Sequence, residues 1–409
     1  MAASPVTAPP PGNPRFPLLD SMRAIAALSI VAYHVAFFSR ATEHGVSGAL
    51  LSRLGVGVTI FFVISGFVLY RPMVRARWDG EPQRPLRDYA GRRALRIVPA
   101  YWLALTVLAL YPGLLGAFTD RWWVYYGFGQ VYSGDTILKG IGPAWSLCTE
   151  LVFYAALPFL AVALGRAWRG GRRRGVRAEL AVLAVLGLAS LGFRAAIELG
   201  DGASYLNQTI LGTFDGFALG MALAVASVAL ADGRERPAAV RLVAARPGVA
   251  WALALACFAA AAAVGGPDPA FLLGTDTPAG EALAVRVLGL LTAVALLAPA
   301  MFGDDAGGSP RRLLAWPALA WLGAISYGIY LWHYPIIQRV TVGPDMEGFP
   351  GGSAWRIAAI SVPIVIACAA LSYHLLERPL LRRARGRPRA RAATGPPPAP
   401  EPARASPPP

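Results

Sequence analysis

The first long apolar segment of the chain, LLDSMRAIAALSIVAYHV, contains three ionisable residues, Asp20, Arg23 and His34. An ionisable side chain near the centre of a bilayer costs about 2.5–3.5 kcal/mol on insertion scales, so a membrane helix that keeps one usually does so for function. Arg23 and His34 are eleven positions apart, which on a helix places both on one face with a rise of about 16 Å between them. A histidine in such a position can accept a proton as a general base. The alternative is a structural Asp20–Arg23 pair beside a hydrogen-bonded histidine.

Glu150, in AWSLCTELVFY, is predicted at a depth similar to that of His34, about 10 Å from the outer end of its segment. A carboxylate at that depth can hold the imidazole in one tautomer and stabilise its protonated form, as a general base requires. The alternative partner for Glu150 is an arginine such as Arg194, which is also predicted in the outer third of the membrane. His333 falls in the outer third as well, and we expect its loss to be milder than that of His34. Asp215 is predicted near the middle.

Ser65, in FFVISGF, is predicted near the inner end of the second membrane segment. The segment does not fit the strand–turn–helix pattern of a hydrolase nucleophile elbow. A Ser–Gly pair in a membrane helix is usually a close-packing contact. Ser65 is therefore either a packing residue or a contact for a bound ligand.

Arg93 and Arg96 precede the third membrane segment, in GRRALRIVPAYW, at the predicted inner face. Residues at i and i+3 share a helix face, and each guanidinium offers a planar fork of donors that suits phosphate. The two arginines are therefore a candidate phosphate site. The alternative is that they only set topology through their charge.

The composition excludes a soluble protein. Of 409 residues 56% are hydrophobic and 15% charged, with a mean hydropathy of +0.49, and several apolar stretches have spanning length, roughly 17–25 residues each. The ten predicted spans are 18–38, 54–70, 96–112, 143–165, 179–199, 204–231, 248–264, 281–302, 313–337 and 354–376. The aromatic stretch Trp122–Phe128 is too short to span and is expected to lie in the interface or to re-enter. No metal-ligand spacing occurs, so no metal site is expected.

Lysine and arginine are distributed unevenly over the predicted loops. With the N-terminus inside, the inner segments hold 29 of the 38 such residues and the outer segments five. This asymmetry satisfies the positive-inside rule, so both termini are predicted to be cytoplasmic, and a net charge of +15 needs no nucleic-acid partner. The sequence thus predicts an all-α bundle of about ten membrane helices over 18–381, with disordered tails at 1–17 and 382–409. Asp20 and Arg23 favour a retained first helix over a signal peptide.

The same segments resemble the acyltransferase-3 family of integral-membrane O-acyltransferases. LDSMRAIAALSIVAYH resembles the family's first helix, with Arg, ten residues and His, and FFVISGFVLY resembles its second. RRALRIVPAYW carries its Arg-x-x-Arg motif, and WSLCTELVFY resembles its Trp-Ser-Leu-x-x-Glu segment. TFDGFALGMALA, SYGIYLWHYPI and LLERPL resemble later motifs, so that seven matches run in order from residue 18 to about 381. Ser21–Met22 and Cys148–Thr149 differ from the family's usual residues and include none of the proposed catalytic groups.

The resemblance implies a cytoplasmic acyl-CoA donor, with no permanently bound cofactor. It implies transfer of a short acyl group, most simply acetyl, to a hydroxyl of a glycan, a lipid-linked sugar or a natural product such as a macrolide. The implied site residues are His34, Glu150 and Arg23 for catalysis, with Arg23 also contacting the donor, and Arg93, Arg96 and Ser65 for donor binding. Direct transfer and a relay through an acyl-histidine both remain open.

A transporter is the alternative class of protein. In that case Arg23, His34, Glu150 and Asp215 would line a substrate or proton path. Transporters of this kind usually show two related halves with helices broken by Gly or Pro in corresponding places, and the sequence has no such symmetry. Some members of the resembled family carry an extracytoplasmic hydrolase-like domain. This sequence has no comparable segment, so acceptor binding is expected to use the bundle and its loops, in a multi-pass protein of the plasma membrane.

Overall fold

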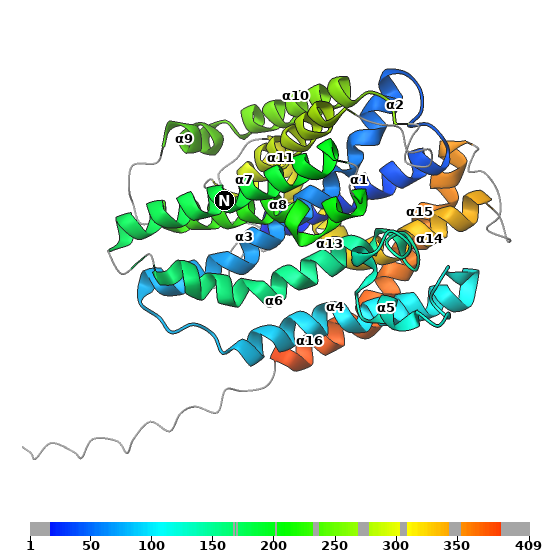
Figure 1. Ribbon diagram of the computed structural model, residues 1–409, viewed down its shortest axis with the longest axis horizontal. Coiled ribbons are helices and arrows are strands. Elements are labelled where there is room, and N and C mark those ends of the chain that lie inside the picture. The colour runs from blue at the N-terminus through cyan, green and yellow to red at the C-terminus, as the bar shows by residue number, and fades with distance from the viewer. Residues whose placement is uncertain are drawn as a thin grey trace, which may run out of the picture.

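The computed structural model describes residues 17–166, 168, 171–200, 203–231, 237–268, 278–302, 309–342 and 353–385. Within those ranges every regular element is helical, and no strand occurs. The long helices run roughly along one common direction in a single bundle (Figure 1). The predicted all-α membrane fold is therefore confirmed.

The helices follow the predicted spans closely, with short helices in several of the connections. The first eight are α1 (Pro17–Phe38), α2 (Gly45–Ser52), α3 (Val56–Asp79), α4 (Leu86–Leu108), α5 (Trp122–Tyr126), α6 (Trp145–Gly165), α7 (Arg172–Leu199) and α8 (Ile210–Ala229). The remaining eight are α9 (Ala238–Ala245), α10 (Pro247–Gly265), α11 (Ala279–Met301), α12 (Ser309–Leu314), α13 (Pro317–Ala324), α14 (Ser326–Val342), α15 (Ala354–Ser372) and α16 (Arg378–Arg385). α10 lies beside α11, and α16 lies beside α4 at the opposite edge of the bundle (Figure 1).

Nine helical stretches in the described part of the chain are long and apolar enough to cross a membrane. The predicted span 313–337 is the one that falls short, because the chain turns at Ile325 and divides it into α13 and α14. α13 packs directly on α1: a Cβ at Gly323 would lie 1.8 Å from the carbonyl oxygen of Asp20. The glycine permits this contact, and α14 then continues along α1 from Ser326.

Helix α3 is longer than predicted and packs closely on α8. It continues to Asp79, although the predicted span ended at residue 70. A Cβ at Gly220 would lie 2.1 Å from the Val63 carbonyl oxygen, and a Cβ at Gly66 would lie 2.4 Å from that of Phe217. Small residues allow two membrane helices to approach in this way. The close-packing interpretation of the Ser–Gly pair is therefore confirmed for its glycine.

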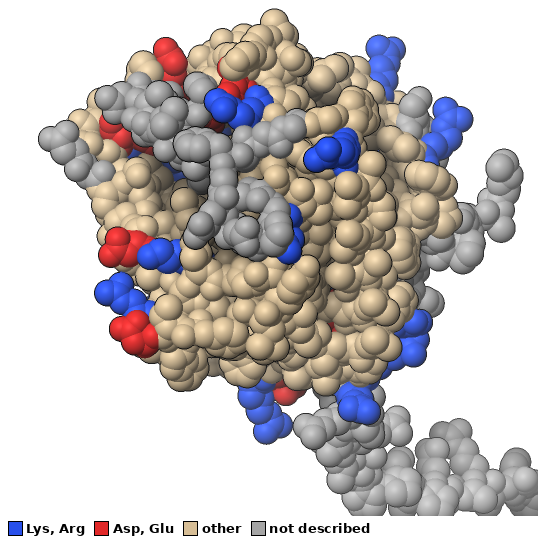
Figure 2. Space-filling model, turned by 90° about the vertical axis from the view of Figure 1, so that its right-hand side faces the viewer, with Lys and Arg blue, Asp and Glu red and all other residues tan. Residues whose placement is uncertain are grey.

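The aromatic stretch at 122–128 forms only the short helix α5, as its length predicted. It is fastened to α4 by two hydrogen bonds, from the Tyr101 hydroxyl to the Tyr125 carbonyl oxygen (2.9 Å) and from the Trp102 indole to the Tyr126 carbonyl oxygen (3.0 Å). Figure 2 views the end of the molecule near α5 and shows charged side chains scattered among broad uncharged areas. Such an end suits the predicted outer face, which carries few cations.

The two predicted tails fall mainly on residues 1–16 and 386–409, which lie outside the described residues. At the C-terminal boundary, α16 extends through Arg385. Residues 382–385, assigned to the tail from the sequence, are therefore helical.

Candidate active site

A pair of histidines joins α1 to α14 inside the bundle. The Nδ1 atom of His34 lies 2.9 Å from the carbonyl oxygen of Ile30, one turn earlier in α1. The Nε2 atom of His333 lies 3.2 Å from the same Nδ1 atom. His333 is fully buried, and its own Nδ1 lies 2.7 Å from the carbonyl oxygen of Tyr330. The two imidazoles therefore form one hydrogen-bonded unit.

This pairing was missed by the sequence analysis, which treated His333 as a separate histidine at similar depth. The two residues are 299 positions apart, and helix periodicity carries no information about contacts between distant helices. The equal predicted depth of the two histidines was the only available signal. Because His333 contacts His34, the substitution of His333 is not an independent control for the substitution of His34.

Aromatic rings enclose the histidine pair. Tyr33 and Tyr334 approach His34 edge-on, with ring centroids 4.9 and 5.1 Å away. Tyr334 also lies against the end of the connection that leads into α6, where a Cβ at Gly142 would meet its ring at 3.2 Å. These contacts restrict the orientation of the His34 ring.

Glu150 does not take the predicted role of orienting His34. Its carboxylate accepts hydrogen bonds from the Ser65 and Tyr154 hydroxyls. The part of α6 that reaches α14 is its outer end, where Ser146 donates to the Tyr330 hydroxyl (2.7 Å), which itself donates to a backbone carbonyl oxygen. Glu150 is four residues further along α6, about 6 Å deeper. The predicted contact between Glu150 and His34 is therefore wrong, because Glu150 lies deeper than the part of α6 that reaches the histidines.

Arg194 is not the partner of Glu150 either. Its guanidinium donates to the carbonyl oxygens of Asn207 and Gly212, at 2.8 and 3.1 Å, and lies 3.9 Å from Glu198. These partners lie on α7, in the connection between α7 and α8, and at the start of α8. The alternative interpretation of Glu150 as the counter-ion of Arg194 is therefore wrong.

Ser65 lies in a longer helix than predicted. Because α3 spans Val56–Asp79, Ser65 is close to the middle of the helix rather than near its inner end. The side chain is buried and donates to Glu150. The structure thus joins two predicted site residues, Ser65 and Glu150, that the sequence had placed at different depths.

A small cavity of about 40 Å³ lies between α1, α3, α6 and α14. Polar groups line one part of it and apolar side chains the other. The lining residues are Arg23, Val58, Phe61, Phe62, Ser146, Leu147, Glu150, Ser326, Tyr327 and Tyr330. Tyr330 connects the cavity to the histidine pair, because its ring lines the cavity while its carbonyl oxygen holds His333.

Arg23 contributes the positive charge in this cavity. Its Nε atom is buried and forms no hydrogen bond within the described part of the chain. Asp20 is exposed, and no ion pair joins it to Arg23 among the described residues. The predicted alternative of a structural Asp20–Arg23 pair is therefore not observed. Arg23 faces the cavity with donors still available for a ligand.

Arg93 and Arg96 extend the positive charge from the cavity along α4. The Arg93 guanidinium lies 6.0 Å from the centre of the Tyr154 ring, and its buried Nε has no hydrogen-bond partner among the described residues. Arg96 lies close enough to Arg23 for their charges to interact, and both also interact with Glu377, which is buried near the end of α15. The structure thus gathers the three predicted donor-binding arginines around Glu150 and the cavity.

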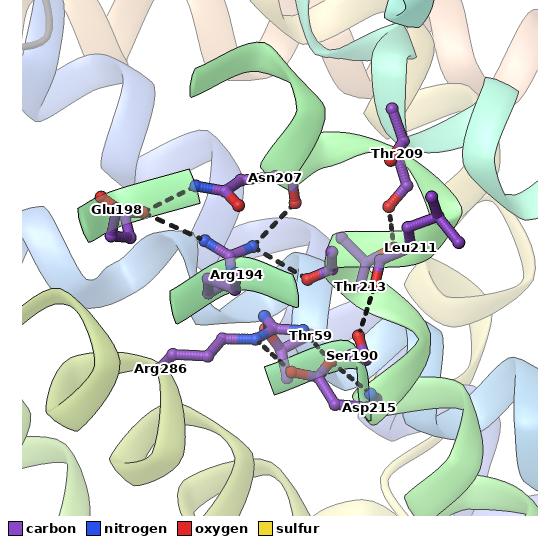
Figure 3. A network of polar contacts seen from close by, with 12 residues as sticks. Thr59, Ser190, Arg194, Glu198, Asn207, Thr209, Leu211, Thr213, Asp215 and Arg286 are labelled. Atoms are coloured by element: carbon purple, nitrogen blue, oxygen red, sulfur yellow. Dashed lines mark hydrogen bonds and ion pairs between the residues drawn. The ribbon is translucent and has the colours of Figure 1, made fainter. Parts of the chain in front are cut away.

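Asp215 belongs to a separate polar cluster (Figure 3). Its carboxylate forms a bidentate pair with Arg286, with Nε–Oδ2 at 2.9 Å, and Arg286 also donates to the Thr59 hydroxyl at 3.0 Å. The backbone N–H of Gly216 donates to the same carboxylate at 2.6 Å. Every charged group in this pair is satisfied, so the pair holds α3, α8 and α11 together. It does not line the cavity.

The fold and this site define a polytopic membrane protein with a hydrogen-bonded histidine pair near a cavity lined in part by an arginine. The model of the acyltransferase-3 family, described as an acyltransferase domain, matches residues 16–373. The chain therefore belongs to this family of membrane acyltransferases, as its motifs predicted.

Curated relatives support the same assignment. The chain is 26% identical over 382 residues to the peptidoglycan O-acetyltransferase OatA of Listeria monocytogenes. The alignment covers 89% of this chain and 55% of the relative. It is 25% identical over 389 residues to the putative peptidoglycan O-acetyltransferase YrhL of Bacillus subtilis, covering 89% of this chain and 54% of the relative. It is 30% identical over 338 residues to the exopolysaccharide production protein ExoZ of Rhizobium meliloti, covering 81% and 90%.

The chain spans about half the length of the two peptidoglycan O-acetyltransferases and nearly the whole of the exopolysaccharide production protein. No solved structure is significantly similar to it.

Proposed function

We propose that this protein transfers an acetyl group from acetyl-CoA to a hydroxyl of a cell-surface glycan, as a multi-pass enzyme of the plasma membrane. The observation that carries the proposal is the pairing of His34 with His333, which Tyr330 links to a cavity lined by Arg23, with Arg96 and Arg93 near that arginine. A base and a cluster of guanidinium groups are what acyl transfer from a phosphate-bearing donor requires.

In this proposal His34 accepts the proton of the acceptor hydroxyl while its oxygen attacks the thioester carbonyl carbon. Negative charge develops on the carbonyl oxygen as the tetrahedral intermediate forms, and Arg23, about 16 Å from His34 along α1, holds the donor. The carbon–sulfur bond then breaks, the ester forms, and the His34 imidazolium returns its proton to the departing thiolate of CoA. Atoms and charges balance without a further reactant.

The donor approaches from the side of Arg93 and Arg96. CoA carries several phosphate groups, and guanidinium forks bind phosphate with directed hydrogen bonds. The Arg93 Nε has no partner among the described residues, so it is available for a ligand. This charge pattern supports a CoA thioester over an uncharged acyl donor.

The size of the cavity supports a short acyl group. One water needs about 10–15 Å³ of accessible volume, so about 40 Å³ accommodates only a few non-hydrogen atoms. Val58, Phe61 and Leu147 form an apolar wall that suits a methyl group. Acetyl fits this space better than longer acyl chains.

A glycan acceptor is favoured by the relatives. Two of them are named as peptidoglycan O-acetyltransferases and a third as an exopolysaccharide production protein. A macrolide acceptor has no such support. The transporter alternative has no support from family membership either.

The proposal is tested by acetyl transfer in purified protein reconstituted in nanodiscs. The assay uses radiolabelled acetyl-CoA, with peptidoglycan strands and exopolysaccharide oligosaccharides as acceptors. We expect transfer to one of these glycans, and we expect His34→Ala and His34→Gln to lower the rate by about 10²–10⁴-fold, because general-base catalysis contributes that much. Glutamine can form a hydrogen bond but cannot take a proton, so it separates orientation from base catalysis.

The matched control is His374→Gln, which changes an exposed histidine outside the site and should leave the rate unchanged. If His34→Gln kept more than about a tenth of the wild-type rate, base catalysis by His34 would be excluded.

A further inference from the structure

The hydrogen bonds of the histidine pair determine which ring nitrogens carry protons. A carbonyl oxygen can only accept a hydrogen bond, so the Nδ1 atoms that face the carbonyls of Ile30 and Tyr330 must both carry hydrogen. In a neutral imidazole the other nitrogen then has a lone pair. The Nε2 atom of His333 is therefore an acceptor, and it faces the Nδ1–H of His34 at 3.2 Å. His34 donates one N–H to two acceptors, and every contact is satisfied with both rings neutral.

The same assignment leaves the Nε2 atom of His34 with a lone pair. No side chain or backbone group of the described residues forms a hydrogen bond with it. This atom is the one a general base needs. Protonation there produces an imidazolium whose Nδ1–H still donates to Ile30 and His333, and both acceptors stabilise the added charge.

We propose that His333 is a positioning residue that fixes His34 in its Nδ1–H tautomer and stabilises its protonated form during acyl transfer. The inference rests on the proposed function of His34. In a Ser-His-Asp triad an aspartate performs this task on the imidazole Nδ1–H. Here the acceptor is a neutral ring nitrogen.

The surroundings of His333 favour a neutral acceptor over a carboxylate. Its helix packs through Ile329 and Ile337, with Ile325 at the turn just before it, in an apolar cluster with α1 and α15, and all three isoleucines are fully buried. An ionised carboxylate in such surroundings would carry a large desolvation cost. A neutral imidazole anchored through its other nitrogen supplies an oriented lone pair at much lower cost.

Two substitutions test the proposal in the acetyl-transfer assay. His333→Leu removes the acceptor and keeps an apolar side chain, whereas His333→Gln places an amide oxygen near the position of Nε2. We expect His333→Leu to lower kcat by about 10²-fold or more, within the range of general-base effects, with the KM for acetyl-CoA changed less than twofold. We expect the kcat of His333→Gln to be at least tenfold higher than that of His333→Leu. A purely structural role would move KM or the folded fraction with kcat, and glutamine would not rescue kcat selectively.

A double mutant shows whether His333 acts through His34. His34→Ala combined with His333→Leu should be no slower than His34→Ala alone, because a positioning residue has no effect once its partner is gone. If instead the two losses multiply, or if His333→Leu keeps more than half of the wild-type kcat, the positioning role is overturned. If His34→Ala itself remains active, the proposed function of His34 fails, which is a different outcome.

Thermal unfolding and size-exclusion profiles control for folding. Should His333→Leu fail to fold, His333→Gln is compared with His333→Asn, whose shorter side chain brings its amide oxygen less far toward His34. A kcat for the asparagine variant at least tenfold below that of the glutamine variant supports the role, and equal values overturn it.

Discussion

Arg23 has hydrogen-bond donors that no described residue satisfies and that a bound ligand would satisfy. A guanidinium has five N–H donors, yet the structure gives Arg23 no hydrogen-bond partner among the described residues, and its Nε is buried. Leaving a buried charged donor unpaired costs free energy, about 1–3 kcal/mol or more. A protein tolerates that cost where a bound group satisfies the donor during function. The position of Arg23 in the cavity beside Glu150 indicates where that group binds.

The donor arginines give a prediction at this scale. Replacing both Arg93 and Arg96 with glutamine should raise the Kd for acetyl-CoA at least tenfold while the protein stays folded and inserted. Glutamine removes the charge and the donor fork but keeps much of the aliphatic stem, and charge-assisted contacts are typically worth about 1.5–3 kcal/mol each.

The measurement is acetyl-CoA binding to the purified protein by calorimetry. Arg87→Gln is the control, because it removes an arginine from the same helix whose side chain is 90% exposed. An unchanged Kd in the double mutant would leave Arg93 and Arg96 as topology signals only.

Phe61 gives a second prediction, about acyl length. Phe61→Ala removes a ring from the apolar wall of the cavity, where it lies 6.3 Å from the Tyr330 ring. The variant should use propionyl-CoA and butyryl-CoA better relative to acetyl-CoA, with the kcat/KM ratio rising about tenfold, since one or two methylenes in an apolar pocket are worth about 1–3 kcal/mol. Competition between labelled acyl-CoA donors measures this ratio. A ratio equal to that of the wild type would show that Phe61 does not limit acyl length.

At the scale of helices, the sequence predicted the individual membrane spans and did not predict the contacts between distant helices. The lengths of the apolar stretches correctly placed nine spans, because a membrane helix is specified by its own apolar residues. The predicted end of the second span was too early, because α3 continues beyond the apolar stretch to Asp79 and composition alone does not fix where such a helix ends. The contact between His34 and His333 could not be predicted, because it depends on how α14 packs against α1.

The α3–α8 contact gives a prediction at this scale. Gly220→Ala would place a Cβ 2.1 Å from the Val63 carbonyl oxygen, so α3 must move away from α8. Overpacking of this kind costs about 1–3 kcal/mol. We expect a lower melting temperature in detergent and a loss of acetyl transfer, because Ser65 moves with α3 and releases Glu150.

Gly192→Ala is the matched control for this change. Gly192 lies within α7, where a Cβ would meet nothing within 4 Å, so alanine should be neutral or slightly stabilising there. Equal melting temperatures for the two variants would show that the α3–α8 contact is not tight.

At the scale of the whole molecule, a row of polar residues joins the arginines at the start of α4 to the histidine pair. It begins at Arg93 and Arg96, passes Arg23 and the cavity, and reaches the histidine pair through Tyr330. In the proposed function, the donor binds near the arginines and the acceptor near the histidine pair. Which side each comes from depends on the orientation of the chain in the membrane.

Topology therefore gives the last prediction. A reporter fused after residue 385 should read cytoplasmic, and one inserted near Asp268 should read external. Asp268 donates its backbone N–H to the Thr42 carbonyl oxygen at 3.0 Å, which places both at the end of the bundle that α1 reaches just beyond His34. The uneven distribution of lysine and arginine orients that end outward. Nine helical stretches in the described part of the chain can span by length and composition, so the C-terminal reporter also tests whether α13 and α14 together make a tenth crossing. An external C-terminal signal would mean that they do not, because an odd number of crossings leaves the two termini on opposite sides.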